Sequence, residues 1–317
     1  MRFNRSITVV TLAVLLSATT IFAEKRPDDP NTVLAYQLDN GGWPKNYDRR
    51  EKLTTTKLAT ITKNKDQIKN ATIDNGATHR DIRILAAAHA KTGKDKFATA
   101  ALNGINYLLS AQYSNGGWPQ FYPQTKGYHG HITFNDGAMI GVMSLFQDIV
   151  KSKDHFSFVP ETIRQQCVEA NRRGLECILR CQIRVDGKMT VWCAQHDQES
   201  LAPRKARSYE LASLSGSESV GIVRYLMSIE NPSPRVVNAI KSAVTWFKQS
   251  QINGQRLEKF TREDGKTDRR LVPNPDATPL WARFYDIKTN RPIYCSRDGI
   301  PRATLAEISH ERRNGYS

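Results

Sequence analysis

Cysteine is scarce in this 317-residue chain, which has only five. They stand at irregular spacings and their odd number leaves at least one unpaired, which excludes a fold held together by a disulfide framework. Cys177 and Cys181 lie one helical turn apart, a spacing that also occurs in zinc sites. No second pair at such a spacing accompanies them, so we expect buried, structural cysteines rather than metal ligands.

Long hydrophobic runs are also missing, except at the N-terminus. Arg2 and Arg5 are followed by an apolar stretch over 7–23 that has small residues near its end, the pattern of a secretory signal. We predict cleavage after Ala23, with an uncleaved anchor as the alternative, and a single domain over 24–317. No later stretch reaches the roughly 20 apolar residues that span a bilayer. We therefore expect a secreted or periplasmic protein without membrane association after cleavage.

Acidic residues are too few to balance the basic ones. The chain has 46 Lys and Arg against 31 Asp and Glu, a formal net charge of +15 at pH 7. Such an excess predicts an anionic partner. The signal segment and the lack of a nucleic-acid-binding motif argue against nucleic acid, so an extracellular polyanion is favoured. The hydrophobic fraction of 39% is that of a globular protein and excludes disorder as the main state.

Several familiar catalytic motifs are absent from the sequence. It contains no GxSxG elbow, no HExxH helix, no Walker loop and no EF-hand loop. The histidines are scattered along the chain and form no catalytic pattern. Hydrolysis by an activated serine or by zinc-bound water is therefore disfavoured.

What the sequence does contain is an internal repeat. Segments 37–44 and 112–119 share the pattern Gln-x-x-Asn-Gly-Gly-Trp-Pro, and segments 182–187 and 251–254 repeat its Gln and Gly. The four segments begin about 70 residues apart, a period typical of stacked supersecondary units. We call them the Gln–Gly signatures.

Helical periodicity between the signatures predicts three helical hairpins. Their helices are expected over 77–91 with 96–112, 137–151 with 160–182, and 216–230 with 234–251. Long stretches that we interpret as irregular follow at 113–135, 183–215 and 252–300. Loops of this length usually carry function, so we expect them to gather on one face of an all-α fold. A closed ring of hairpins and an open superhelix both fit the pattern.

Two carboxylates stand directly before predicted helices, and we place them at matching positions of the repeat. Asp74 lies in Thr-Ile-Asp-Asn-Gly and Asp136 in Thr-Phe-Asn-Asp-Gly, while Ser215 precedes the third hairpin. All three are good helix N-caps, a role worth about 1 kcal/mol each. The alternative is that the two aspartates, with Asn75 or Asn135, supply oxygen ligands to a hard cation such as calcium.

Basic and aromatic residues cluster in the later loops. Lys205 and Arg207 are followed by Tyr209, and Arg283 and Arg297 stand in similar surroundings. A solvated charged surface is the ordinary interpretation; the alternative is a groove in which arginines grip carboxylates. Among the tryptophans, we expect Trp43 and Trp118 in the core, and Trp281 either there or stacking on sugar rings.

Taken in order, these motifs resemble polysaccharide lyase family 10, the pectate lyases. The resemblance spans roughly residues 33–300 and is carried by segments 40–46, 72–78, 115–120, 134–139, 206–210 and 281–285. It implies an (α/α)3 toroid whose long loops form a substrate groove. It also implies cleavage of polygalacturonate into unsaturated oligogalacturonides by β-elimination, assisted by Ca2+.

The same resemblance implies roles for individual residues. Arg207 matches the base, and Asp74 and Asp136 match acidic site residues that also bind the metal. The implied substrate-binding residues are Asn75, Lys205, Tyr209, Arg283 and Arg297. A free guanidinium has a pKa above about 12, so an arginine base requires nearby cations and desolvation, and a lysine is the fallback.

Two other points stay open at the level of sequence. A non-catalytic extracellular polyanion-binding protein with the same groove is the alternative function. The sequence does not determine the oligomeric state, and we expect a monomer.

Overall fold

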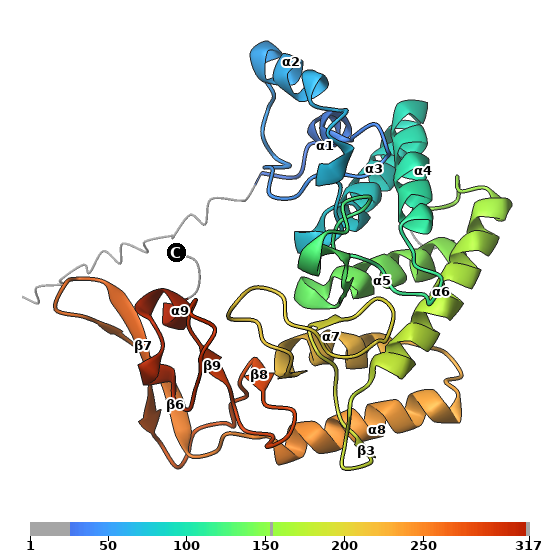
Figure 1. The fold of residues 1–317 in the computed structure, drawn as a ribbon. Coiled ribbons are helices and arrows are strands. Elements are labelled where there is room, and N and C mark those ends of the chain that lie inside the picture. The colour runs from blue at the N-terminus through green and yellow to red at the C-terminus, as the bar shows by residue number, and fades with distance from the viewer. Residues whose placement is uncertain (1–25, 153–154, 315–317) are drawn as a thin grey trace, which may run out of the picture.

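The structure, a computed structural model, describes residues 26–152 and 155–314. It consists mainly of α-helices joined by long loops, with short two-stranded sheets along the loops (Figure 1). The predicted signal segment 1–23 lies outside the described residues, as does the proposed cleavage position. Within the described part of the chain, no helix combines the length and the apolar character needed to span a bilayer.

The elements follow the chain in this order. The α-helices are α1 (Pro30–Tyr36), α2 (Thr55–Lys63), α3 (His79–Thr92), α4 (Asp95–Ser110), α5 (Ala138–Val150), α6 (Glu161–Cys181), α7 (Gly216–Met227), α8 (Pro234–Gln249) and α9 (His310–Asn314). The short 3-10 helices are η1 (Ile68–Asn70), η2 (Asp74–Gly76), η3 (Gly127–Gly130), η4 (Asn135–Gly137) and η5 (Leu305–Glu307). The strands are β1 (Ile132–Thr133), β2 (Arg184–Val185), β3 (Lys188–Met189), β4 (Gln195–His196), β5 (Leu214–Ser215), β6 (Gln255–Thr261), β7 (Thr267–Pro273), β8 (Phe284–Tyr285), β9 (Tyr294–Cys295) and β10 (Pro301–Arg302).

The three predicted helical hairpins are confirmed. Helix α3 packs on α4, α5 on α6, and α7 on α8. Their first helices pack in the order α3, α5, α7 and their second helices in the order α4, α6, α8, so the hairpins succeed one another from the top to the bottom of Figure 1. The mostly helical class is thereby confirmed, whereas closure of the hairpins into a toroid stays a prediction.

The expectation of an all-α fold with an irregular last loop was wrong in one respect. Strands β6 and β7 form a seven-residue antiparallel hairpin inside 252–300, with Leu257 opposite Leu271. The Asp264–Gly265 turn and the alternation of residues on either side encode it, but the many charged side chains hide that alternation. In Figure 1 these strands, with β9 and α9, lie to the left of the helices.

The Gln–Gly signatures tie each repeat to the next hairpin. The side-chain amide of each of the first three signature glutamines donates two hydrogen bonds, one within its own turn and one to the second helix of the following hairpin. The acceptor pairs are the carbonyls of Gly41 and Ala100 for Gln37, Gly116 and Ala170 for Gln112, and Thr190 and Ala239 for Gln182. The repeat therefore encodes the stacking of successive units.

One signature glycine shows why the turn cannot carry a side chain. Gly116 has a φ of +92°, and a Cβ built on it would lie 2.1 Å from the carbonyl oxygen of Arg173 in α6. Only glycine combines this φ with such a close approach of two backbones.

Each unit also has a tryptophan that bonds to a helix. The indoles of Trp43 and Trp118 are fully buried, which confirms the prediction that both belong to the core. They donate to the carbonyls of Val33 in α1 and Leu108 in α4, at 2.7 and 2.8 Å. The tryptophan of the third unit, Trp192, donates to Ile178 in α6, and that of the fourth unit, Trp281, donates to Phe247 in α8.

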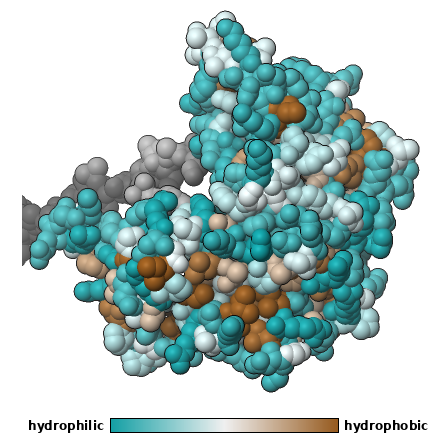
Figure 2. Space-filling model, in the orientation of Figure 1, coloured by the Kyte–Doolittle hydropathy of each residue, from teal (hydrophilic) through white to brown (hydrophobic). Residues whose placement is uncertain are grey.

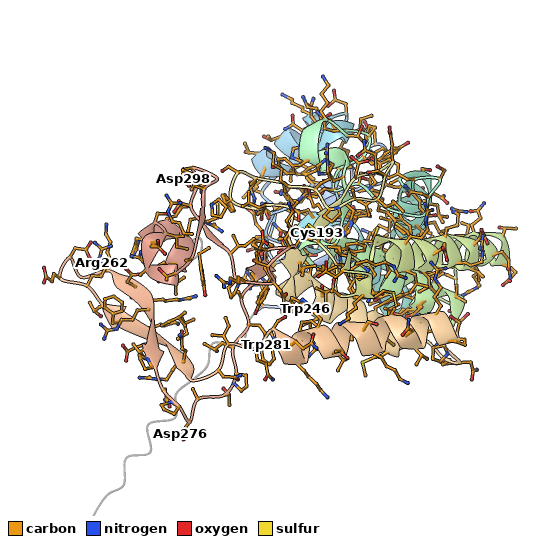
Figure 3. The ribbon with its side chains drawn as sticks, turned by 60° about the horizontal axis from the view of Figure 1, so that its bottom comes forward. Cys193, Trp246, Arg262, Asp276, Trp281 and Asp298 are labelled. Carbon is orange, nitrogen blue, oxygen red and sulfur yellow. The ribbon has the colours of Figure 1, made fainter. Side chains whose placement is uncertain are left out.

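The sequence pattern alone missed the tryptophan of the third unit. The β2–β3 hairpin separates Trp192 from Gln182, so the residues of the signature no longer stand together. The tryptophan of the fourth unit, Trp281, is 43% exposed and stands where the C-terminal strands meet α8 (Figure 3). It is thus fixed by its indole bond to Phe247, with part of its ring open to solvent.

All five cysteines are buried and none forms a disulfide. The sulfur atoms of Cys177 and Cys181 lie 4.0 Å apart across one turn of α6. Burial agrees with the structural role predicted for them.

His196 is fully buried and both of its ring nitrogens contact the backbone, at the amide of Cys193 (3.1 Å) and the carbonyl of Leu201 (2.9 Å). Burial lowers the pKa of His196 to about 4, against the opposing effect of these hydrogen bonds. The unfolded chain, with an ordinary histidine pKa of about 6.5, therefore binds a proton that the folded chain excludes.

We expect this histidine to make the fold sensitive to acid. Its contribution to stability is complete above a pH of about 6.5 and falls by about 1.4 kcal/mol per pH unit as the pH drops toward 4. Urea unfolding of the wild type and of His196→Gln between about pH 7 and pH 4.5 measures the two slopes. His196→Gln is expected to give the shallower slope and the exposed control His155→Gln the wild-type slope; equal slopes in all three proteins would contradict the prediction.

Candidate active site

Three loops converge beside the starts of α3, α5 and α7. The turn η2 packs against η4, and η4 packs against α7. Each loop donates a backbone hydrogen bond to the segment that follows the tryptophan of the next unit. The pairs are Ile73 to Gln120 (3.2 Å), Phe134 to Ala194 (2.9 Å) and Gly216 to Arg283 (2.8 Å). The repeat therefore brings the long loops to a common face, as predicted.

The two candidate aspartates do not hold the matching positions that we expected. Asp74 corresponds to Asn135, since both are buried and open their 3-10 turn, whereas Asn75 corresponds to Asp136. Asn75 and Asp136 both have a φ of +51°, the left-handed conformation that asparagine and aspartate tolerate best among non-glycine residues. One carboxylate thus lies at the base of the site and the other at its surface.

The N-cap interpretation holds for Ser215 and is wrong for the aspartates. Ser215 accepts a hydrogen bond from the backbone of Glu218 in the first turn of α7. The N-cap of α3 is Thr78 and that of α5 is Gly137. Left-handed Asn75 and Gly76 lie between Asp74 and the start of α3, whereas Asp136 is itself the left-handed residue directly before Gly137. The carboxylates of Asp74 and Asp136 are therefore not used in capping.

Asp74 is buried, and only one of its two carboxylate oxygens has a hydrogen-bond partner. Its Oδ2 lies 2.5 Å from the Nζ of Lys45, while its Oδ1 is buried without a hydrogen-bond partner. Lys45 stands two residues after Trp43, the place that Arg283 has after Trp281. This correspondence was a signal for Lys45 that we missed at the level of sequence.

Asp136 is exposed but surrounded by other carboxylates. Its Oδ2 accepts a hydrogen bond of 2.9 Å from the side-chain amide of Asn135. Partial desolvation raises the pKa of Asp136, and the charges of Asp74, Glu218 and Glu210 raise it further, against the charge of Arg283. A site with these properties favours the arrival of a cation.

Arg283 bridges the second and third loops. Its Nη2 donates to Asn135 Oδ1 at 2.7 Å and to Glu218 Oε1 at 2.6 Å. Burial by itself would lower its pKa, but the charge and hydrogen bonds of Glu218 outweigh burial and raise it. Arg283 is therefore a fixed cation whose side chain remains 36% exposed toward the site.

Arg207 is held by a second buried carboxylate. Its Nε and Nη2 donate to the two oxygens of Glu210 at 2.8 and 2.5 Å. Burial would raise the pKa of Glu210, but the hydrogen bonds and charge of Arg207 prevail and lower it. The side chain of Arg207 is 36% exposed and that of Glu210 only 6%, so the pair presents its guanidinium outward.

The ring of Tyr209 lies beneath three guanidinium groups. They belong to Arg207 (5.0 Å from the ring centre), Arg297 (5.5 Å) and Arg312 (3.7 Å). Tyr209 is only 3% exposed, so its position favours holding these arginines over direct contact with a ligand. Arg312 comes from the C-terminal helix α9, which no pattern in the sequence connected to this site.

Comparison with known protein families shows to which family the chain belongs. Residues 37–317 match the family model described as pectic acid lyase. The chain belongs to the pectic acid lyase family.

Two solved structures of a family 10 polysaccharide lyase from Cellvibrio cellulosa are similar to this lyase. One is a mutant of that enzyme in complex with trigalacturonic acid, of which the match covers 87%; in the other structure the match covers 86% of the chain. Both show 34% sequence identity over 91% of the present chain, with a TM-score of 0.79. The search of curated proteins gave no match. The resemblance to family 10 pectate lyases predicted from the sequence is confirmed.

The remaining predicted residues of the lyase lie at the edges of the site. Asn75 is exposed and its side-chain amide donates to Asn46 Oδ1 at 3.0 Å. Lys205 is also exposed and lines a cavity of about 500 Å3 with Arg204 and Tyr128, apart from the Glu210 pair. Of the two candidate bases, Arg207 is therefore the one that the fold holds in place by direct ion pairing.

The donor set of the lyase suits a hard cation only in part. The buried, unbonded Oδ1 of Asp74 and the crowded carboxylate of Asp136 are oxygen ligands of the kind that calcium prefers. Among the described residues, however, no group of three or more acidic, histidine or cysteine side chains is arranged to hold a metal. Further oxygen ligands would have to come from substrate and water.

Proposed function

We propose that this chain is a secreted or periplasmic pectate lyase that cleaves polygalacturonate by β-elimination. The observation that carries the proposal is the placement of two guanidiniums, on Arg207 and Arg283, each fixed by a buried glutamate beside Asp74 and Asp136. Family membership and the trigalacturonic acid bound to the similar lyase support the substrate class. The proposal includes a toroidal arrangement of the three hairpins and the signal segment at 1–23.

In this proposal each cation has a role. Arg207, in its neutral form, takes the proton from C5 of a galacturonate unit; the electron pair of that bond forms the C4–C5 double bond, and the bond from C4 to the glycosidic oxygen breaks. Arg283 and Lys45 hold substrate carboxylates and stabilise the negative charge that develops on them. The leaving oxygen takes a proton from water.

Calcium fits the same proposal. Asp74 and Asp136 would hold the ion together with substrate carboxylates, and its charge would acidify the C5 proton. A site completed by substrate agrees with the incomplete donor set that the described residues provide alone.

The Arg207–Glu210 pair sets a constraint on the base. A bidentate carboxylate stabilises the protonated guanidinium, whereas proton abstraction requires the neutral form. Glu210 therefore positions Arg207 and, through its charge, opposes its activation. The two effects can be separated by substitution.

We expect Glu210→Gln and Glu210→Ala to change the pH profile in opposite ways. Glutamine keeps an acceptor for Arg207 but removes the negative charge, so the pKa of Arg207 falls. Each unit of this fall raises the neutral fraction of Arg207 about tenfold, and kcat below the pH optimum rises accordingly. Alanine leaves Arg207 unsupported, so kcat falls at every pH. Rates from about pH 7 to 10 measure both, with the surface variant Glu176→Gln as control. Equal losses in both Glu210 variants would show that Glu210 acts only in folding or positioning.

The alternative is a non-catalytic polyanion-binding protein, which the net charge of +15 would also explain. Mass spectrometry of products from trigalacturonate separates the two. A pectate lyase yields one product with an unsaturated end and no added water. Intact trigalacturonate after long incubation, with binding that salt abolishes, would favour the alternative.

A further inference from the structure

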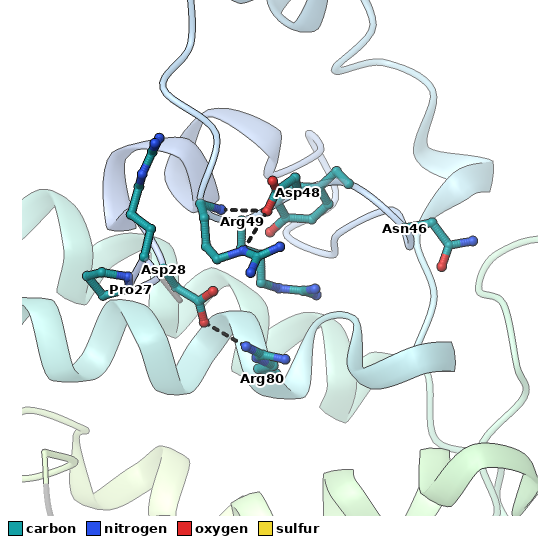
Figure 4. A pocket seen from close by; sticks show the side chains of 9 residues that line it. Pro27, Asp28, Asn46, Asp48, Arg49 and Arg80 are labelled. Atoms are coloured by element: carbon teal, nitrogen blue, oxygen red, sulfur yellow. Dashed lines mark hydrogen bonds and ion pairs between the residues drawn. The ribbon is translucent and has the colours of Figure 1, made fainter. Parts of the chain in front are cut away.

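A cavity of about 800 Å3 lies beside the loop that carries Asp74 and Asn75, which we call the first site loop. It is lined by four arginines, Arg26, Arg49, Arg50 and Arg80, together with Asp28 and Asp48. Figure 4 shows that these side chains come from the N-terminal segment, from the loop after Asn46 and from α3. None of them belongs to the site around Asp136, Arg207 and Arg283, which we call the central site.

The cavity adjoins the central site at two points. Asn46, which lines the cavity, accepts the hydrogen bond of 3.0 Å from Asn75 in the first site loop. The stem of Arg80 runs beside Gly76 of the same loop, its Cβ and Cδ within 4.0 Å of where a Cβ on that glycine would stand. A polymer leaving the central site on this side would therefore meet the arginines.

One of these arginines forms a buried ion pair that belongs to the fold, whereas two others form exposed ion pairs that a ligand can replace. The guanidinium of Arg49 is bound to the fully buried Asp81 at 2.5 Å, and this carboxylate also accepts from Tyr47, so Arg49 forms the floor. Arg80 pairs with Asp28 at 2.8 Å and Arg50 with Asp48 at 3.0 Å, with arginine side chains 56% and 40% exposed. Exposed pairs of this kind contribute little to stability, so the carboxylates of a ligand can replace the aspartates at small cost.

We propose that this cavity, which we call the outer arginine pocket, is a subsite for the carboxylates of a long polygalacturonate chain. The chemistry of the lining favours that ligand over neutral pectin, since two exposed guanidiniums on different segments match an anionic polymer with one carboxylate per unit. The proposal rests on the proposed function, because it requires the polymer to occupy the central site. It implies that chain length determines affinity.

The test compares a short and a long substrate. We expect Arg50→Ala combined with Arg80→Ala to raise KM for polygalacturonate roughly tenfold, the effect of losing one or two charge-assisted hydrogen bonds. KM and kcat for trigalacturonate are expected to stay within about twofold of the wild type, because the proposal places a trimer in the central site and only longer chains in the pocket. Arg235→Ala, which removes an exposed arginine paired with Glu176 on another face, is the matched control.

Calorimetric titration with oligogalacturonates from the trimer up to about ten units gives a second readout that needs no turnover. In the wild type, affinity is expected to rise with length beyond the trimer, and in the double variant this rise is lost. Equal losses for trimer and polymer, or an unchanged KM for polymer, would overturn the proposal. If turnover is absent but the length dependence and its loss are both found, the catalytic proposal fails while the outer arginine pocket stands.

Discussion

Replacing Arg207 by alanine is expected to lower kcat on polygalacturonate by at least about 10³-fold while binding of trigalacturonate persists. Removing a general base usually costs about 10² to 10⁴ in rate, and here the lost group also carries a charge that faces the site. Arg283 and Lys45 remain to hold substrate carboxylates, so affinity changes little. Single-turnover rates and calorimetric titration with trigalacturonate measure the two quantities separately.

The control for this variant is Lys205→Ala. Lys205 stands two residues from Arg207 and is the other candidate base, but it is exposed and has no buried carboxylate partner among the described contacts. Lys205→Ala is expected to keep kcat within about tenfold of the wild type, because Lys205 is an exposed charge at the edge of the site. Near-normal turnover in Arg207→Ala together with its loss in Lys205→Ala would assign the base to Lys205.

Replacing Asp136 by alanine is expected to abolish the dependence of turnover on calcium and to lower kcat/KM by roughly 10² or more, as loss of a metal ligand does. The carboxylate is crowded by Asp74, Glu218 and Glu210, so removing it takes away the exposed part of the cation site. Asp74→Ala is expected to have a similar effect, since it also leaves Lys45 without its partner.

Calcium binding in the presence of trigalacturonate, followed by calorimetry, tests the same residues without relying on turnover. The wild type is expected to bind calcium only when substrate is present, and both aspartate variants to bind none. Asp186→Asn, which changes an exposed carboxylate in the β2–β3 turn, serves as control. Wild-type calcium binding by Asp136→Ala would remove this residue from the metal site.

Local periodicity was sufficient to predict the hairpins and part of the core. The apolar spacing of α3 to α8 is a property of each segment, and the burial of Trp43 and Trp118 follows from their place in the signature. The β6–β7 hairpin was missed although the Asp264–Gly265 turn was visible, because charged side chains on both strands conceal the alternation. Sequence patterns are weakest where a strand pair is mostly solvent-exposed.

The site was predictable in its residue types and much less in its geometry. Asp74 and Asp136 were assigned matching places because they are the same residue type, whereas the repeat aligns Asp74 with Asn135. The partners that the arginines have far away in the sequence were not predicted. Arg283 reaches Asn135 across 148 residues of sequence, and no local pattern encodes such a contact. The same holds for Arg312, which reaches Tyr209 from the C-terminal helix.

Ultraviolet absorbance during incubation with polygalacturonate at alkaline pH is the decisive test of cleavage by β-elimination. Elimination creates a double bond conjugated with the carboxylate, which hydrolysis does not. With the purified mature chain, we expect a steady rise in absorbance when calcium is present and no rise when a chelator replaces it. Constant absorbance in the presence of calcium, with polygalacturonate demonstrably bound, would contradict this mechanism.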